Sequence, residues 1–288
     1  MNDAWVALSI QPRIGLKLIR ALQQHFGDDL QAALSANLSE LQRVPGIGQK
    51  TAATIRAIDI EHVQQLITRW RASGIHIIPC QPDAPDYPAA LRQIDFPPAT
   101  LFVRGTWSPT HDGLKAAVIG TRQPSYVAKA AAQQISQRLT RAGYTLVSGL
   151  AHGVDGIAHQ TACDQAARTI AVLGCGVSHV YPPEHHQLSE RILQTGGALV
   201  SEAAPDATVS TPLLVSRNRI ISGLSELVFI IETSIDGGAM HAAQHAVKQG
   251  RRLYALDLPH ASGNQALIKA GMANPIAPDL RNLQLPLP

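Results

Sequence analysis

Two patterns of hydrophobic residues divide the chain. Up to about residue 73 the apolar positions recur at helical spacing, as at Ile14, Leu18 and Leu22, and no run is typical of a strand. From Lys115 onward, short and almost continuously apolar runs alternate with longer segments of helical periodicity. Strands that are apolar on both faces are typical of a parallel sheet covered by helices on either side. The pattern therefore predicts a small all-α region followed by an α/β region.

The α/β region has a regular order of expected elements. Strands are predicted at residues 116–119, 145–147, 169–173, 198–200, 227–231 and 252–256. Helices are predicted at residues 126–142, 155–166, 185–194, 216–223 and 238–249, with a further one around 265–270. Strands that alternate with helices in this way indicate a Rossmann-like, doubly wound, mostly parallel sheet.

The helical region contains a short turn between two helical segments. Residues 44–52 read Val-Pro-Gly-Ile-Gly-Gln-Lys-Thr-Ala, which is a helix-hairpin-helix pattern. We therefore expect residues 1–73 to form a small all-α domain of the SAM or helix-hairpin-helix type. The hairpin amides of such a motif can meet a DNA phosphate whatever the base sequence, or the motif can serve for packing alone.

A connector is expected between the two regions. Ile75, Ile77 and Ile78 indicate a short strand, and residues 101–103 look like an edge strand. Prolines between 79 and 88 interrupt the segment. The predicted division is therefore a helical domain at residues 1–73, a connector with short strands at 74–110, and the Rossmann-like domain at 111–288.

Composition narrows the class of protein. The 288 residues are 45% hydrophobic and 16% charged, which suits a globular chain of about two domains. No run of 18 apolar residues and no signal-peptide pattern is present, so we expect a cytoplasmic protein without a membrane span. The cysteines Cys80, Cys163 and Cys175 form no CxxC pair, which fits reduced thiols. The net charge of +3 is compatible with nucleic-acid binding but not diagnostic of it.

Glycine-containing turns follow three of the expected strands. They are Gly120-Thr121-Arg122, the Ser-Gly-Leu-Ala-His-Gly segment at 148–153, and Gly237-Gly238 at the start of a helix. Such turns leave backbone N–H groups free to bind phosphate. Arg122 stands in the first turn, and Arg217-Asn218-Arg219 adds a second basic element. The sequence therefore predicts a crevice that holds a polyanion, although each turn taken alone is also compatible with an ordinary connection.

Other polar residues suggest chemistry less strongly. Asp155 and His159 are four residues apart and can pair on one helix face, although a capping Asp155 with His159 packed beneath it explains them equally simply. His241 and His245 have the spacing of zinc ligands but lack the HExxH glutamate and a third ligand. The chain also lacks GxGxxG, a P-loop and a nucleophile elbow. We therefore expect no catalytic residue, no metal and no cofactor.

These motifs together resemble the DNA-processing protein A family, also called DprA or Smf. The resemblance covers the chain from the helical N-terminus to about residue 271. It rests on motifs whose order and spacing are highly specific. They are Gly-Thr-Arg at 120–122, Ser-Gly-Leu-Ala-x-Gly-x-Asp at 148–155 with His159, Ala-Val-Leu-Gly-x-Gly at 171–176, Tyr-Pro at 181–182, Ser-Glu at 201–202, Arg-Asn-Arg-Ile-Ile at 217–221, and Ser-Gly-x-x-x-Leu-Ile at 262–268.

The resemblance implies a cytoplasmic protein that binds single-stranded DNA and acts as a homodimer. Such a protein protects incoming strands in natural transformation and loads a RecA-type recombinase on them, without being an enzyme. Carried over by position, the phosphate-holding residues are Gly120, Arg122, Ser148, Gly149, Gly153, Arg217 and Arg219. The turns themselves add Thr121, Leu150, Asn218, Gly237 and Gly238. Weaker candidates for extending the basic patch are Lys129, Lys248 and Arg251.

Two other classes of protein remain possible interpretations of the same crevice. A nucleotide-binding or phosphoribohydrolase-like enzyme of the Lonely-Guy type has a similar sheet and glycine pair. Such an enzyme needs an acidic residue on the following helix, where this chain reads Met240-His-Ala-Ala-Gln-His245. A member that keeps the fold only to dimerise or dock partners is the third interpretation.

Overall fold

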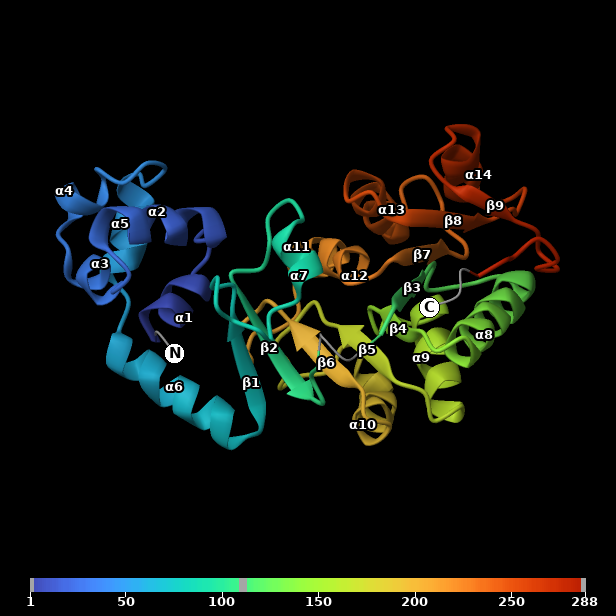
Figure 1. Ribbon diagram of the computed structural model, residues 1–288, viewed down its shortest axis with the longest axis horizontal. Helices are drawn as coiled ribbons and strands as arrows, with labels where there is room; N and C mark the ends of the chain where they lie inside the picture. Colours follow the sequence, from blue (N-terminus) through green and yellow to red (C-terminus); the bar gives the residue numbers. More distant parts are fainter. Residues whose placement is uncertain (1–2, 109–112, 286–288) are drawn as a thin grey trace.

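The computed structural model describes residues 3–108 and 113–285 (Figure 1). The expected boundary at residues 110 and 111 lies outside this part. The helices are α1 (Asp3–Ser9), α2 (Leu16–Phe26), α3 (Gln31–Ser35), α4 (Leu38–Leu41), α5 (Gln49–Arg56), α6 (Ile60–Ala72), α7 (Ala89–Arg92), α8 (Tyr126–Arg141), α9 (Val154–Asp164), η1 (Pro183–His185, a 3-10 turn), α10 (His186–Gln194), α11 (Thr211–Ser216), α12 (Asn218–Gly223), α13 (Gly238–Lys248) and α14 (Ser262–Lys269). The strands are β1 (Ile75–Pro79), β2 (Thr100–Gly105), β3 (Lys115–Ile119), β4 (Thr145–Ser148), β5 (Thr169–Val172), β6 (Ala198–Ser201), β7 (Leu227–Ile230), β8 (Arg252–Leu256) and β9 (Asn274–Ile276).

In the described part of the chain, nine strands form one sheet in the order β1-β2-β6-β5-β4-β3-β7-β8-β9. The strands from β6 to β9 run parallel, whereas β2 pairs antiparallel with both β1 and β6. Strands β4 to β6 follow one another on one side of β3, and β7 to β9 continue on the other side. The order therefore reverses between β3 and β7, and the predicted doubly wound, mostly parallel α/β fold is confirmed.

Helices cover both faces of the sheet because its strands are apolar on both faces. In β3, Ala116 and Val118 pack in the cluster that includes α8 and α9. Their neighbours Ala117 and Ile119 point to the other face, where buried residues of α12, α13 and the N-terminal helices form a second cluster. Figure 1 shows α2 to α5 gathered beyond the β1 end of the sheet. The buried side chains of the N-terminal helices thus join the same hydrophobic cluster as one sheet face.

The segment that connects the helical and α/β regions belongs to the main sheet. The expectation of an edge strand at 101–103 is wrong, because β1 pairs along the outer side of β2 and β6 along its inner side. Phe102 is fully buried as a result. The helix α1 also packs here, where the Trp5 indole N–H donates a hydrogen bond to the Ala99 carbonyl at 2.9 Å.

The predicted helix-hairpin-helix motif has the expected local structure. Helices α4 and α5 flank the turn, in which Gly46 has a φ of +87°, a value that suits glycine. Val44 and Ile47 are buried and fix the turn against the helices. No helix within the described residues is long and apolar enough to cross a membrane.

Candidate functional site

A cleft of about 700 Å³ opens at the carboxyl ends of β3 and β7. This is the point where the strand order reverses, the usual position for ligands in open α/β sheets. The cleft is lined by Ile119, Gly120, Thr121, Arg122, Gln123, Ala151, Asp155, Tyr181, Thr211, Leu214, Val215, Arg217, Asn218, Thr233, Ser234, Gly237, Gly238 and Ala239. Seven of the predicted residues are in this set, namely Gly120, Thr121, Arg122, Arg217, Asn218, Gly237 and Gly238.

The turn after β3 is clamped on both sides. The Thr121 N–H donates to the Glu232 carbonyl at 2.7 Å, and the Thr121 carbonyl accepts from the Val154 N–H at 3.2 Å. A Cβ atom at Gly153, whose φ is +74°, would lie 2.4 Å from the Thr121 carbonyl oxygen. Gly153 therefore permits the close approach of α9 to this turn. Gly153, one of the predicted phosphate-binding residues, does not line the cleft; it lines a second hollow beside it.

Arg122 stands on this clamped turn with its side chain exposed. No carboxylate within residues 3–108 and 113–285 forms an ion pair with its guanidinium. An exposed guanidinium on a rigid turn retains all five donors for a phosphate. Arg122 is thus the cation of the cleft that is most available to a ligand.

Arg217 has a different role, because its guanidinium is buried. The Nη1 atom donates to the carbonyls of Gly149 and, at 2.6 Å, Val172. The Nη2 atom lies 4.0 Å from Asp155 Oδ2. Arg217 therefore joins the ends of β4 and β5 beneath the cleft. Both of these hydrogen bonds come from Nη1, while the buried Nε has no hydrogen-bond partner among the described residues.

Gly149 leaves the space that this guanidinium occupies. A Cβ atom there would lie 2.4 Å from Arg217 Cζ. Its neighbours are also internal: the Ser148 hydroxyl donates to the Val118 carbonyl at 2.7 Å, and Leu150 is fully buried with a φ of +58°. Ser148, Gly149 and Leu150 thus support the floor of the cleft without lining it.

Asp155 and His159 each take partners other than one another. Asp155 Oδ2 accepts from the N–H groups of Gly149 at 3.1 Å and Ala151 at 3.4 Å. Burial raises the pKa of Asp155, and the charge of Arg217 opposes that rise. His159 packs beneath the loop with Nδ1 2.8 Å from Thr169 Oγ1, and burial lowers the pKa of His159 to about 3. His159 is therefore a neutral core residue near pH 7.

The N-terminus of α13 forms the opposite wall. Its N-cap is Gly237, which has no side chain to bond the first N–H groups of the helix. A side chain at Gly238 would meet open space, so this end of the helix is accessible from the cleft. Asn218 Nδ2 donates to the Gly238 carbonyl at 3.3 Å and ties α12 to α13. The helix dipole and the free amides favour an anion here.

Two residues outside the predicted set, Asn264 and Glu232, hold the cleft in shape. Asn264 is fully buried, accepts from the Thr233 N–H at 2.9 Å and donates to the Leu256 carbonyl at 2.8 Å. Glu232 accepts from the Ser125 N–H at 2.7 Å and contacts His260 Nε2 at 2.7 Å. Asn264 occupies one of the unspecified positions of the Ser-Gly-x-x-x-Leu-Ile motif, and its place in that motif is the feature of the sequence that could have indicated its role.

Besides Ser148, Gly149, Leu150 and Gly153, two more predicted residues lie outside the cleft. The Arg219 guanidinium forms a two-pronged ion pair with Glu202, at 2.6 and 2.5 Å, and its Nε donates to the Phe96 carbonyl at 2.8 Å. Lys248 is exposed at the far end of α13. Within the described residues, no group of three His, Cys, Asp or Glu side chains is placed to hold a metal, so His241 and His245 gain no third ligand.

The fold and the cleft together define a class. This is a Rossmann-like α/β protein in which hydrogen-bonded glycine turns, a helix N-terminus and an unpaired arginine lie together at the switch point of the sheet, the place between β3 and β7 where the strand order reverses. The family model described as DNA recombination-mediator protein A matches residues 79–282. The chain belongs to the DNA-processing protein A family.

Individual relatives agree with this assignment. The chain is 35% identical over 211 residues to DNA processing protein DprA of Bacillus subtilis, which covers 72% of this chain and 70% of that protein. It is 32% identical over 292 residues to protein Smf of Escherichia coli, covering 96% and 76%.

Solved structures show the same fold. The X-ray structure of DNA processing protein A from Streptococcus pneumoniae matches with a TM-score of 0.79 and 25% identity, covering 96% of this chain and 94% of that one. A structure that addresses the single-stranded DNA binding mode of DNA processing protein A from Helicobacter pylori matches with a TM-score of 0.62 and 29% identity, covering 70% and 90%.

Proposed function

We propose that this protein binds single-stranded DNA in the cleft at the switch point. The observation that carries the proposal is the exposed, unpaired Arg122 on a clamped turn, facing the same cleft as the free N-terminal amides of α13. Both groups are donors that match phosphate oxygens, and neither distinguishes one base from another. The family relationship supports DNA as the source of those phosphates, since the Helicobacter pylori structure concerns single-stranded DNA.

The protein is expected to hold the DNA backbone more than the bases. Only 4% of its residues are aromatic, so stacking platforms are few. Affinity that depends on phosphate contacts falls as salt rises. Because Arg217 and Arg219 are engaged within the protein, the charged contact in the cleft is assigned to Arg122.

The biological role that we propose follows from the family. The protein protects incoming strands during natural transformation in the cytoplasm and loads a RecA-type recombinase on them. It acts as a homodimer and as a binding protein, not as an enzyme. The family description of a recombination mediator supports this role.

An enzymatic role in the same cleft has little support from its side chains. Among the described residues that line the cleft, Asp155 is the one carboxylate, and its Oδ2 atom is bonded to two backbone amides beside Arg217. A carboxylate held in this way is poorly placed to exchange protons with a substrate. The helix α13 also carries no acid, unlike the helix that a phosphoribohydrolase requires.

The test is equilibrium binding of labelled oligonucleotides followed by fluorescence anisotropy. We expect the protein to bind a single strand more tightly than a duplex of the same length, and to bind mononucleotides weakly. It should also accelerate assembly of a RecA-type recombinase on strands coated with single-strand-binding protein. A folded protein that binds no single strand at low salt would disprove the proposal.

A further inference from the structure

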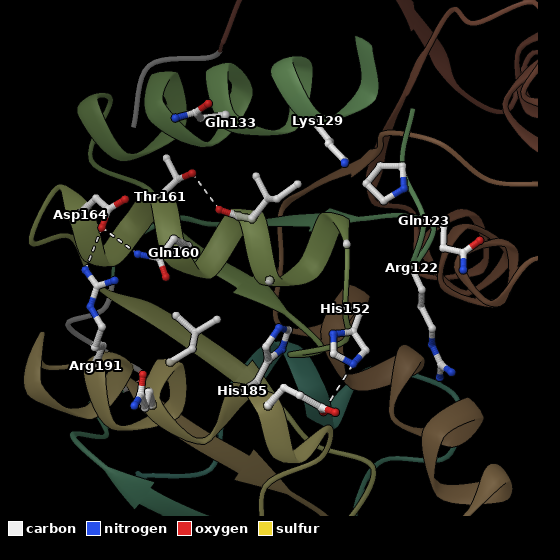
Figure 2. A pocket seen from close by; sticks show the side chains of 17 residues that line it. Arg122, Gln123, Lys129, Gln133, His152, Gln160, Thr161, Asp164, His185 and Arg191 are labelled. Atoms are coloured by element: carbon white, nitrogen blue, oxygen red, sulfur yellow. Dashed lines mark hydrogen bonds and ion pairs between the residues drawn. The ribbon is translucent and has the colours of Figure 1, made fainter. Parts of the chain in front are cut away.

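A second hollow adjoins the cleft and has no role in the function proposed above. It is a groove of about 1030 Å³ between α8, α9 and α10. Arg122 and Gln123 line both the cleft and the groove, so the two form one continuous surface. Figure 2 shows Arg122 and Gln123 at one end of the groove and Arg191 at the other end. A ligand that passes Arg122 can therefore continue into the groove.

Charge is distributed unevenly along this groove. Lys129 projects from α8 near the Arg122 end, as Figure 2 shows. Its side chain is exposed, and no ion pair within the described residues involves it. Arg122 and Lys129 are thus two successive unpaired cations that lead from the cleft into the groove. Two unpaired cations along one surface suit the successive phosphates of a strand.

The rest of the groove has carboxylates beside its basic side chains. Arg191 Nη2 lies 2.8 Å from Asp164 Oδ1, and His152 Nε2 lies 3.6 Å from Glu184 Oε2. Asp164 offsets the charge of Arg191, and Glu184 adds a carboxylate, so this part of the groove adds no net attraction for an anion. The groove is therefore most attractive to a polyanion at the end that meets the cleft.

The face of α8 that borders the groove also carries groups that can contact bases. Gln133 lines the groove one helical turn beyond Lys129. Tyr126 does not line the groove itself, but it is 88% exposed and lies three residues before Lys129, on the same stripe of the helix. An exposed aromatic ring next to free cations is a typical stacking surface for an unpaired base. The amide of Gln133 can donate to and accept from any base edge.

We propose that the DNA strand held in the cleft continues past Arg122 into the groove, with a phosphate at Lys129 and a base stacked on Tyr126. This inference rests on the proposed function. A nucleic acid is favoured over an acidic peptide because the two free cations extend a phosphate-type cleft and an exposed ring accompanies them. The groove thus lengthens the binding site from a single pocket to a track.

Thiol protection tests the path directly. Cys80, Cys163 and Cys175 are all buried, so a cysteine introduced by Gln133→Cys is the accessible thiol. We expect a saturating 20-residue oligothymidylate to slow maleimide labelling of that cysteine about tenfold or more. The matched control is Lys269→Cys, at the exposed end of α14, whose labelling rate should stay unchanged.

Binding affinity provides a second, independent measurement. Tyr126→Ala should weaken binding of the same oligonucleotide about fivefold or more. Lys129→Ala should weaken it about threefold and reduce the salt dependence by about 0.7 in log–log slope. The controls are Phe96→Ala, which removes another exposed ring, and Lys269→Ala, which removes the same charge elsewhere. Phe96 lies between α7 and β2 and Lys269 ends α14, so neither shares a helix with Lys129 and Gln133, and neither lines the groove or the cleft.

The outcomes separate this inference from the proposed function. If the protein binds DNA and Arg122→Ala weakens that binding, but residue 133 stays unprotected and the α8 variants bind normally, the track is wrong and the cleft proposal stands. If the protein binds no single strand, both fail. If polyglutamate protects residue 133 and DNA does not, the groove is a peptide site and the track is again wrong.

Discussion

Gly149→Ala is the substitution that most sharply tests the buried scaffold beneath the cleft. The added methyl group would lie 2.4 Å from both Arg217 Cζ and Arg217 Nη2, closer than real Cβ contacts. The guanidinium is 92% buried on a side-chain basis, so it cannot swing into solvent without leaving its site. Displacing it breaks the hydrogen bonds to the carbonyls of Gly149 and Val172 and separates it from Asp155.

The expected cost follows from these contacts. Overpacking of a well-filled site costs about 1–3 kcal/mol, and breaking a buried ion pair on one side costs about 3–5 kcal/mol. The two effects overlap because the same movement causes both. We therefore expect Gly149→Ala to lower the free energy of unfolding by about 3–5 kcal/mol, a large part of the 5–15 kcal/mol typical of a folded protein.

Urea unfolding followed by circular dichroism measures this cost. The matched control is Gly238→Ala, where the new methyl group meets open space and should change stability by about 1 kcal/mol or less. In an Arg217→Ala background, Gly149→Ala should cost less than about 1 kcal/mol, because the clash is gone. A Gly149→Ala protein as stable as the parent, or equally destabilised in both backgrounds, would refute the reasoning.

Three further predictions concern other buried polar groups. Burial lowers the pKa of His159 from 6.5 to about 3, so as the pH falls the imidazole is protonated in the unfolded chain before it is protonated in the folded protein. The contribution of His159 to stability should therefore be complete above pH 6.5 and fall by about 1.4 kcal/mol per pH unit below it. Urea unfolding at pH 7.5 and 5 should show this loss, and His159→Leu should flatten it. Arg219→Ala leaves the Glu202 carboxylate without its ion-pair partner and should lower the free energy of unfolding by about 3 kcal/mol. The affinity of the folded variant for single-stranded DNA, measured by anisotropy, should stay within about threefold of the parent. Asn264→Ala leaves the Thr233 N–H without its acceptor, so it should cost about 1–3 kcal/mol in urea unfolding and also weaken DNA binding, because that loop lines the cleft; unchanged values of both would contradict its supporting role.

The sequence predicted the α/β architecture well because a strand that is buried on both faces has apolar residues at successive positions, which is easy to recognise. The strand expected at 252–256 coincides with β8, and the helix expected at 238–249 is α13 to within one residue. The pattern was less informative at the edges of the sheet. Strand β9 has three residues and includes Pro275, too short for a period to be visible, and the position of β2 inside the sheet depends on its distant partner β6.

The candidate site was predictable where position along a strand determines it. Gly120, Arg122 and Gly238 follow β3 and β7, and parallel strands bring their carboxyl ends to one edge. The burial of Arg217 and the ion pair of Arg219 were not predictable, because spacing shows that arginines are close in sequence but not which carbonyl or carboxylate each one meets. Asn264 was missed for the same reason, since three of its four backbone partners lie more than 30 residues earlier.

The most direct test of the central claim is the salt dependence of single-strand binding by the parent protein, Arg122→Ala and Arg141→Ala. Arg141 is an exposed arginine at the far end of α8 and controls for the lost charge. We predict tight, salt-sensitive binding by the parent and by Arg141→Ala. Arg122→Ala should bind about tenfold or more weakly at low salt, with a log–log slope reduced by about 0.7 or more. Equal affinities and slopes for the parent and Arg122→Ala would contradict the claim that this cleft holds the DNA backbone.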